Sequence, residues 1–311
     1  MIFADRLINS IIDKQTPLVV GLDPRLERLP TAIAEEANKA GSTLEANAKA
    51  YERFCFEIID TVAPLVPAVK PQAAFFEVLG VPGMQALWNV VRYAQSKQLQ
   101  VIMDAKRGDI GSTAEAYAQA FLGNETNSSW GCDCLTVNPF LGDDSLEPFV
   151  KRCQDTSSGI FVLVRTSNPG GRMIQELEAN NRKIYSIIAE HVQRLAAADT
   201  GEHGYGSIGA VIGATNPAQL VELRSQMPNS IFLVPGIGAQ GATAKDIAGA
   251  FDERGLGAVI NSSRAIIFAH EKPEFAKFES NWQRAVEAAT RQTIDAIASE
   301  TSAGNLQREA V

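Results

Sequence analysis

The chain has 311 residues, of which 45% are hydrophobic and 21% charged, a composition typical of a folded globular protein and not of a disordered or fibrous one. Its 28 Lys and Arg residues stand against 36 Asp and Glu, which gives a formal net charge of −8. This acidic balance argues against a general binder of nucleic acid or of anionic membranes, both of which need a cationic surface. It does not exclude a small anionic ligand held in a locally positive pocket.

The four cysteines are too few for a disulfide scaffold, and the Cys132–Cys134 pair has no second Cys or His cluster that would favour zinc. The first residues, MIFADRLINS, lack the basic and apolar regions of a signal peptide. No apolar run approaches the roughly 18 residues that a membrane helix needs. We therefore expect a soluble, cytoplasmic protein with reduced thiols and with no nucleic-acid or membrane partner.

Short, nearly continuous apolar runs alternate along the chain with stretches of helical periodicity. Such runs are typical of parallel strands buried on both faces. The expected strands are Pro17–Asp23, Pro67–Gln72, Gln100–Lys106, Cys134–Pro139, Ile160–Thr166, Gly209–Thr215, Ile231–Gly236 and Ala258–Asn261.

The segments between these strands place apolar residues at the i, i+3, i+4 and i+7 positions of amphipathic helices. Ser112 and Glu115 match a capping box at the start of one of them, and Ile247 and Phe251 mark the seventh. Eight strands alternating with helices predict an α/β fold, a (β/α)8 TIM barrel, although a doubly wound sheet would give a similar pattern.

We expect a single catalytic domain over residues 1–300, because no linker-like composition divides the chain. The length beyond a minimal barrel falls in a helical excursion after the first strand, at 27–50, in a second insertion at 169–182, and in a C-terminal helix. The polar residues 301–311 are expected to form a flexible tail.

The third expected strand carries the most informative motif, Asp104-x-Lys106-x-x-Asp109. A period of two places Asp104 and Lys106 on one face of the strand, pointing together into the barrel mouth, where such barrels carry their function. Lys70 ends the neighbouring strand, so that ammonium and carboxylate groups can alternate there. An ion-paired strand end without any function is the simpler alternative, but burying four charges is costly and a fold seldom needs it.

The last two strands supply a second signal. Strand seven ends in the glycine-rich segment that contains Gln240, and strand eight is followed by Arg264. The loops after these two strands are the usual phosphate site of such barrels. Gly236, Gly238 and Gly241 also spell the dinucleotide fingerprint, but no strand-terminal acid follows about 20 residues later. A tight turn that merely needs glycines remains the alternative.

Other chemistries have no motif here. The three histidines are scattered, no HExxH or carboxylate cluster marks a metal, and there is no GxSxG nucleophile motif. Catalysis would therefore have to use lysine and aspartate without a metal.

In combination these motifs resemble the orotidine 5′-phosphate decarboxylase family. The segment DAKRGDIGST, with KPQAAFFE before it and RTSNPGG after it, is similar to the longer bacterial subgroup of that family. The resemblance covers roughly Asp5 to Ile267. It implies conversion of orotidine 5′-monophosphate (OMP) to UMP and CO₂, the last step of de novo pyrimidine synthesis, without any cofactor and in a homodimer.

The resemblance also assigns roles to individual residues. It implies that Lys106 donates a proton to C6, that Asp104 faces the departing carboxylate, and that Lys70 bridges the carboxylates and the ribose. Asp109 would enter the partner subunit's site, with Thr113 nearby. The remaining implied contacts are ribose to Asp23, pyrimidine to Ser167, and phosphate to Gln240 and Arg264.

Two positions depart from the shorter family members. Pro71 and Gln72 follow Lys70, so that the backbone after strand two is expected to run differently. Ser263 stands before the phosphate arginine where the short forms have glycine, which makes close approach of the backbone to phosphate less assured. Two other functions remain as alternatives: a metal-dependent sugar-phosphate decarboxylase of the same superfamily, and a barrel that binds a phosphorylated ligand without turnover.

Overall fold

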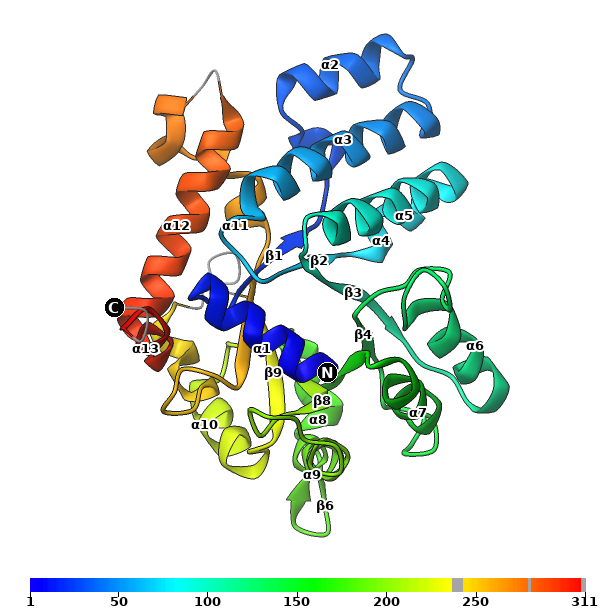
Figure 1. Ribbon diagram of the computed structural model, residues 1–311, viewed down its shortest axis with the longest axis vertical. Coiled ribbons are helices and arrows are strands. Elements are labelled where there is room, and N and C mark those ends of the chain that lie inside the picture. Colours follow the sequence, from blue (N-terminus) through cyan, green and yellow to red (C-terminus); the bar gives the residue numbers. More distant parts are fainter. Residues whose placement is uncertain (237–242, 279–280, 309–311) are drawn as a thin grey trace.

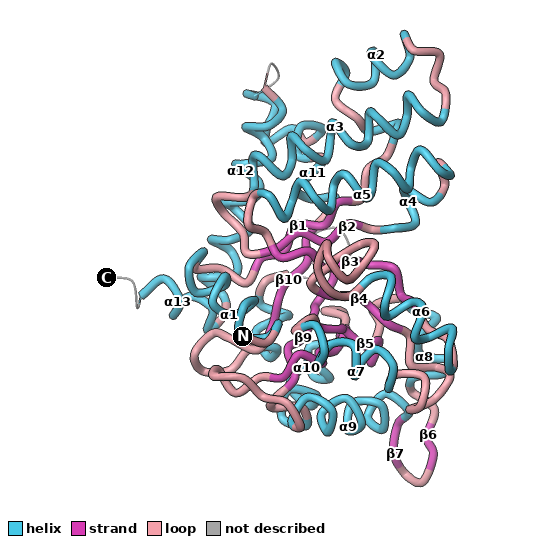
Figure 2. Tube along the Cα trace, turned by 45° about the vertical axis from the view of Figure 1, so that its right-hand side comes forward, coloured by secondary structure: helices cyan, strands magenta, loops and turns pink. Residues whose placement is uncertain are grey.

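The computed structural model describes residues 1–236, 243–278 and 281–308. Eight parallel strands close into a barrel in the order β1-β10-β9-β8-β5-β4-β3-β2. Helices surround these strands (Figures 1 and 2). The (β/α)8 barrel predicted from the alternation of strands and helices is confirmed, and the doubly wound sheet is excluded because the strand order closes on itself.

Most strands begin and end within two residues of their expected positions. β8 is the exception, since it lies three residues before the expected Gly209–Thr215. Its two glycines serve close packing: a Cβ on Gly206 would lie 2.1 Å from the Ala196 carbonyl oxygen, and one on Gly209 would lie 2.5 Å from the Phe161 ring. The barrel strands are β1 Leu18–Leu22, β2 Ala68–Pro71, β3 Gln100–Arg107, β4 Cys134–Val137, β5 Gly159–Arg165, β8 Gly206–Ile212, β9 Ser230–Pro235 and β10 Ala258–Ser262.

The helices pack their apolar faces onto these strands, and the longest ones follow β1, β2 and β10. Their bounds are α1 Phe3–Lys14, α2 Thr31–Lys39, α3 Leu44–Val62, α4 Ala73–Glu77, α5 Gly80–Ser96, α6 Gly111–Phe121, α7 Glu147–Thr156, α8 Arg172–Gln175, α9 Ile184–Ala197, α10 Pro217–Gln226, α11 Arg264–Ile267, α12 Trp282–Glu300 and α13 Asn305–Arg308. No helix in these described ranges is long and apolar enough to cross a membrane.

Two local helix predictions were wrong. α6 begins at Gly111 with no side-chain cap, so that Ser112 lies inside the first turn and the Ser112–Glu115 capping box does not form. The expected seventh helix is only a six-residue 3-10 turn, η3, over Lys245–Ala250, and Phe251 is already extended. Six residues offer too few hydrogen bonds for a stable α-helix, and 3-10 geometry is common in such short connectors.

The two insertions fold as compact additions. The first, after β1, is helical as predicted: α2 leads through a short turn into α3, and the pair projects beyond the barrel (Figure 2). The second contains α8 and a small antiparallel hairpin of β6 Glu178–Ala179 and β7 Arg182–Lys183.

The amino-terminal ends of the strands form the closed base of the barrel. α1 lies across this base, and its Phe3 packs edge-on against Phe161, with ring centroids 6.4 Å apart. A Cβ on Gly159 would lie 2.1 Å from the Phe3 ring, which explains the glycine at the first position of β5. Phe3 is only 2% exposed. The base is therefore plugged by an aromatic side chain that precedes the first strand.

The C-terminal segment also packs against the base, and in this it differs from the expected flexible tail. Ser302 donates a hydrogen bond to the Asp252 carbonyl, in the loop before β10, at 2.7 Å. Ala303 and Leu306 are buried in the main core. These two side chains supply the apolar burial that was not evident in this polar segment. Residues 309–311 lie outside the described part of the chain.

Candidate active site

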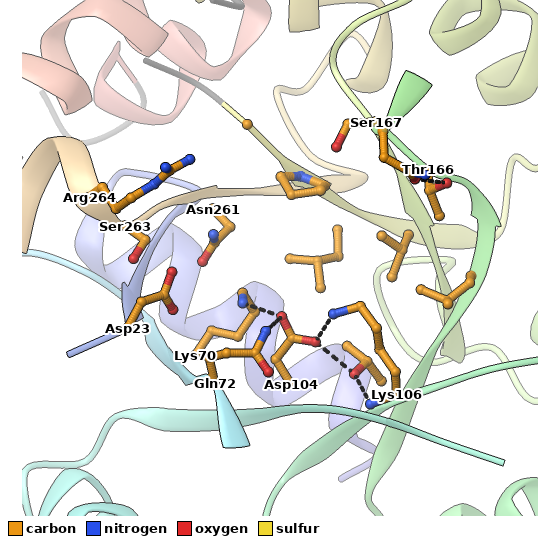
Figure 3. A pocket seen from close by; sticks show the side chains of 17 residues that line it. Asp23, Lys70, Gln72, Asp104, Lys106, Thr166, Ser167, Asn261, Ser263 and Arg264 are labelled. Carbon is orange, nitrogen blue, oxygen red and sulfur yellow. Dashed lines mark hydrogen bonds and ion pairs between the residues drawn. The ribbon is translucent and has the colours of Figure 1, made fainter. Parts of the chain in front are cut away.

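A cavity of about 410 Å³ opens at the carboxyl ends of the strands. Side chains from several strands converge on it, with Lys70, Asp104 and Lys106 on one side and Arg264 on another (Figure 3). This is the end of the barrel opposite the one that Phe3 closes. Functional side chains were predicted at these strand ends, and the cavity lies there.

Asp104 is the centre of the charged cluster. Its Oδ2 accepts hydrogen bonds from Lys70 Nζ at 2.5 Å and from Gln72 Nε2 at 3.0 Å. Its Oδ1 accepts from Lys106 Nζ at 2.6 Å and from Thr136 Oγ1 at 3.0 Å. The carboxylate thus receives four donors, two of which are cations. Such charge-assisted bonds fix the position of both ammonium groups.

The surroundings lower the pKa of Asp104 and raise that of Lys70. Burial alone would raise the pKa of Asp104, but the attraction of Lys70 and Lys106 outweighs it and holds that pKa well below its usual range. Burial alone would lower the pKa of Lys70, but Asp104 and then Asp23 outweigh it, so that the pKa of Lys70 is raised. Asp104 and Lys70 are therefore both charged at neutral pH.

The two lysines differ in exposure. The Lys70 side chain is 5% exposed, whereas that of Lys106 is 46% exposed and reaches the open cavity. Lys70 is thus held by Asp104 at the wall of the cavity, while Lys106 reaches further into the space that a ligand would occupy. An amine held beside a carboxylate in this way can deliver a proton to a ligand atom.

The backbone at Lys106 is irregular. Met103 pairs with Leu135 and Arg107 with Val137, so that three residues of β3 oppose the single residue Thr136 of β4. Lys106 has φ of +47°, in the left-handed region that costs an ordinary residue about 1–2 kcal/mol. Simple alternation along β3 therefore does not explain why Asp104 and Lys106 meet; the bulge turns the lysine back toward the carboxylate.

The Asp23 side of the cavity carries buried polar atoms without partners. Oδ1 of Asp23 and Oδ1 of Asn261 have no hydrogen-bond partner among the described residues. Both side chains line the cavity. Buried acceptors of this kind are suited to hydroxyl donors from a ligand, since leaving them unsatisfied is costly.

The exit of β5 forms a third side of the cavity. Gln175 in α8 accepts from the Thr166 amide at 3.0 Å and donates to Thr166 Oγ1 at 2.8 Å. The buried Arg165 pairs with Glu176 at 2.7 Å and so ties the end of β5 to the residue that follows α8. The second insertion thus fixes the loop that carries Ser167 into the cavity.

Arg264, at the start of α11, lines the cavity on the side of β9 and β10, together with Gly236 and Ser263. Arg264 is an exposed residue, as a binder of an anionic group requires. Gln240, which was expected to share this role, lies outside the described residues, as do Gly238 and Gly241 of the glycine-rich segment.

Asp109 and Thr113 do not line the cavity of their own chain. Asp109 accepts the Ile110 amide at 2.8 Å, just beyond the end of β3, and Thr113 is exposed on the first turn of α6. Of the four expected catalytic residues, the structure therefore brings together Lys70, Asp104 and Lys106, and leaves Asp109 outside this group.

The two departures from the short family members are accommodated locally. Pro71 is the last residue of β2, where a missing N–H is tolerated. Gln72, directly after it, still pairs with Asp104 of β3 in an isolated parallel β-bridge. Ser263 donates to the Gly21 carbonyl at 3.1 Å, and a Cβ on Gly21 would lie 2.7 Å from the Cβ of Ser263. The absent side chain at Gly21 thus makes room for Ser263.

Two polar residues of the cavity, Thr136 and Asn261, were not predicted from the sequence, and Gln72 was placed at a strand end without a role in the site. Each lies at or next to a strand end, which is the only signal that was available. No three His, Cys, Asp or Glu side chains in the described ranges come together in a way that could hold a metal ion.

A closed parallel barrel with a lysine-containing cavity at the carboxyl ends of its strands defines an enzyme of the TIM-barrel class. Within that class, the sequence model of the orotidine 5′-phosphate decarboxylase / HUMPS family matches residues 16–277. The chain therefore belongs to this family, and the family resemblance seen in the sequence is confirmed.

Individual relatives agree with the family match. The chain is 54% identical over 296 residues to an orotidine 5′-phosphate decarboxylase of Rhodopirellula baltica, which covers 94% of this chain and 97% of the relative. It is 42% identical over 268 residues to that of Deinococcus radiodurans, covering 86% and 89%. Among solved structures, OMP decarboxylase of Leishmania donovani is similar with a TM-score of 0.73 and 31% identity, covering 96% of this chain and 98% of that one.

Proposed function

We propose that this chain is a carboxy-lyase that converts OMP to UMP and CO₂ in pyrimidine biosynthesis. The observation that carries the proposal is the Lys70–Asp104–Lys106 cluster at the mouth of a barrel whose relatives bear the name of this enzyme. The cavity of about 410 Å³ is large enough for a nucleotide, with Arg264 on one side and the charged cluster on another.

The reaction breaks the bond between C6 and the carboxylate, and the electron pair stays on C6. The pyrimidine ring delocalises this pair poorly, so the enzyme needs a fixed cation beside C6 before the charge develops. Lys106 supplies that cation, since Asp104 holds its ammonium in place at 2.6 Å. Its proton then passes to C6, which yields UMP, and the neutral amine regains a proton from solvent.

Asp104 has a second effect on the substrate. Its carboxylate is ionised, and it disfavours the substrate carboxylate next to it relative to the state that has lost CO₂. We assign the larger part of the rate enhancement to the preorganised ammonium group, because it costs no reorganisation at the moment of reaction.

The remaining contacts hold the nucleotide away from the reacting carbon. Arg264 binds the phosphate, together with Gln240, and Asp23 and Lys70 bind the ribose. Ser167 hydrogen-bonds the pyrimidine. Binding energy from the phosphate, far from C6, contributes to orienting the ring and excluding water, and this is how it lowers the barrier.

We further propose a homodimer in which Asp109 and Thr113 complete the site of the partner subunit. Both residues lie near the barrel mouth but outside their own cavity. Apolar side chains are exposed in the same region, with Ile110 57% and Phe140 73% exposed, which is consistent with a covered interface.

The activity is tested by incubating the pure protein with OMP and following the loss of substrate absorbance, with and without EDTA. We expect turnover that EDTA leaves unchanged, and Lys106→Ala is expected to abolish it. Lys151→Ala, which removes an exposed lysine from α7, is the matched control and should keep the wild-type rate. A near-normal rate in Lys106→Ala, or a rate that EDTA removes, would overturn the proposal and favour the metal-dependent sugar-phosphate chemistry.

The shared site is tested by mixing two inactive variants, Lys106→Ala and Asp109→Ala. A mixed dimer has one site with both defects and one site with neither, because each site takes Lys106 from one chain and Asp109 from the other. Random exchange gives half mixed dimers, so about a quarter of the wild-type activity should return. Failure of activity to return after proven subunit exchange would show that Asp109 acts within its own chain or not at all.

A further inference from the structure

The bulge in β3 leaves two backbone N–H groups without a partner strand. Asp104, Ala105 and Lys106 oppose one residue of β4, so that the regular ladder of backbone bonds is interrupted between Met103 and Arg107. A buried N–H without an acceptor is costly, and the segment therefore needs one from elsewhere.

The Thr136 side chain supplies that acceptor. Its Oγ1 accepts from the Ala105 amide at 3.1 Å and from the Lys106 amide at 2.9 Å. Its proton goes to Asp104 Oδ1 at 3.0 Å. A hydroxyl has two acceptor sites and one donor, so Thr136 is fully used, and it is only 1% exposed.

These three bonds connect the backbone of Lys106 with the carboxylate that its ammonium contacts. Asp104 Oδ1, which accepts from Thr136, is the same oxygen that accepts from Lys106 Nζ at 2.6 Å. Because both acceptor sites of the hydroxyl face amides, its proton is directed to Asp104 and to no other group. Thr136 thus fixes both the backbone of Lys106 and the carboxylate that the Lys106 ammonium contacts.

We propose that Thr136 is a positioning residue for the decarboxylation: it holds Lys106 in its left-handed conformation and orients Asp104, so that the ammonium stands at a fixed place in the cavity. The inference rests on the proposed function, in which Lys106 delivers the proton to C6. The Thr136 hydroxyl bonds only to Ala105, Lys106 and Asp104 among the described residues, so its effect should fall on turnover and not on binding.

The test compares Thr136→Val with Thr136→Ser. Valine keeps the shape of threonine but removes every hydrogen bond of the hydroxyl, whereas serine keeps the hydroxyl. We expect Thr136→Val to lower kcat for OMP by about 10- to 100-fold, as misplacement of a reacting group by about an ångström does. KM for OMP and the Kd for UMP should stay within about threefold, and Thr136→Ser should regain most of the lost turnover.

Thr290→Val is the matched control. Thr290 is a fully buried threonine in α12 whose hydroxyl donates to the Val286 carbonyl, away from the cavity. It undergoes the same chemical change and should keep the wild-type kcat. Amide hydrogen exchange adds a readout that does not depend on activity: in Thr136→Val the Ala105 and Lys106 amides should exchange faster, and in Thr290→Val they should not.

The outcomes separate the two proposals. A wild-type protein without OMP turnover would refute the proposed function itself. With an active wild type, the positioning role is overturned if Thr136→Val keeps full turnover, if its loss appears in KM with kcat unchanged, or if Thr136→Ser is as impaired as Thr136→Val. Should Thr136→Val fail to fold, Thr136→Ala takes its place against the same serine variant and the same criteria.

Discussion

Replacing Asp104 by asparagine tests how far the charged cluster determines stability as well as activity. The change removes the negative charge that two cations share and leaves Lys70, with a side chain only 5% exposed, without its nearest counter-charge. The amide can accept with its oxygen alone, so its NH₂ group faces two of the four donors around it. Both effects destabilise the folded state.

The magnitude follows from the burial of Lys70. Breaking a buried ion pair by removing one partner costs about 3–5 kcal/mol. Asp23 still attracts Lys70, so we expect the lower end, about 3 kcal/mol in the free energy of unfolding at pH 7. At roughly 2 °C per kcal/mol for a chain of this size, Tm should fall by about 6 °C.

The pH dependence gives a sharper test. In the wild type the pKa of Lys70 is raised, so that Lys70 is protonated in both states up to about pH 10 and contributes no slope below that. In Asp104→Asn burial is no longer outweighed, and the pKa of Lys70 falls below its unfolded value of about 10.4. At pH values between the lowered pKa of folded Lys70 and about 10.4, the unfolded state binds a proton that the folded state has lost. The variant therefore gains stability relative to the wild type as pH rises.

The assay is equilibrium unfolding in urea at several pH values from 7 to 10. Glu287→Gln, which breaks the exposed pair with Arg291 at 2.9 Å, is the control and should cost less than about 0.5 kcal/mol at every pH. The reasoning is refuted if Asp104→Asn costs no more than this control, or if its cost stays constant up to pH 10.

Three further results are expected. Arg264→Ala should lower kcat/KM for OMP by about 10- to 100-fold, the value of one charge-assisted bond, and leave activity on orotidine, which lacks the phosphate, unchanged; an equal loss on both would exclude a phosphate role. Phe3→Ala should lower the free energy of unfolding by about 3–5 kcal/mol in urea titrations, because the cavity beside Gly159 cannot refill, and a cost below 1 kcal/mol would show that the base tolerates the gap. Burial raises the pKa of Tyr185 and of Tyr205 to about 12. The folded state therefore keeps protons that the unfolded state loses, and stability should fall between about pH 10 and 12, less steeply when both are changed to Phe; equal slopes would contradict this.

The barrel could be predicted because its evidence is periodic. Eight apolar runs of the length of buried strands, separated by amphipathic segments, allow few other arrangements. The exceptions arise where packing overrides the local pattern. β8 begins at Gly206 and not at the expected Gly209, and both are strand residues whose missing side chains admit Ala196 and Phe161. The base plug of Phe3 depends on contacts with strands more than 150 residues away, which no local pattern reveals.

The charged cluster illustrates a different limit. Alternation along a strand places Asp104 and Lys106 on one face, and their side chains do meet. The path that brings them together, however, is a bulge with Lys106 at φ of +47°, and its acceptor comes from the next strand. Thr136 lies in an apolar run of β4 and resembles an ordinary β-branched strand residue. Its role depends on a register shift between two strands, which the sequence of either strand alone does not contain.

The closed base determines where a fusion partner or a surface linker can be joined to the protein. Phe3 packs against the start of β5, and Ser302 bonds the loop that precedes β10, so that both residues lie on the side away from the mouth. A carrier protein, a surface linker or a second enzyme joined at either end would therefore leave the entrance for nucleotides unobstructed. Because α1 and the residues around Leu306 are part of the packed core, such a linker should be attached before α1 or after Leu306, where it does not disturb these contacts.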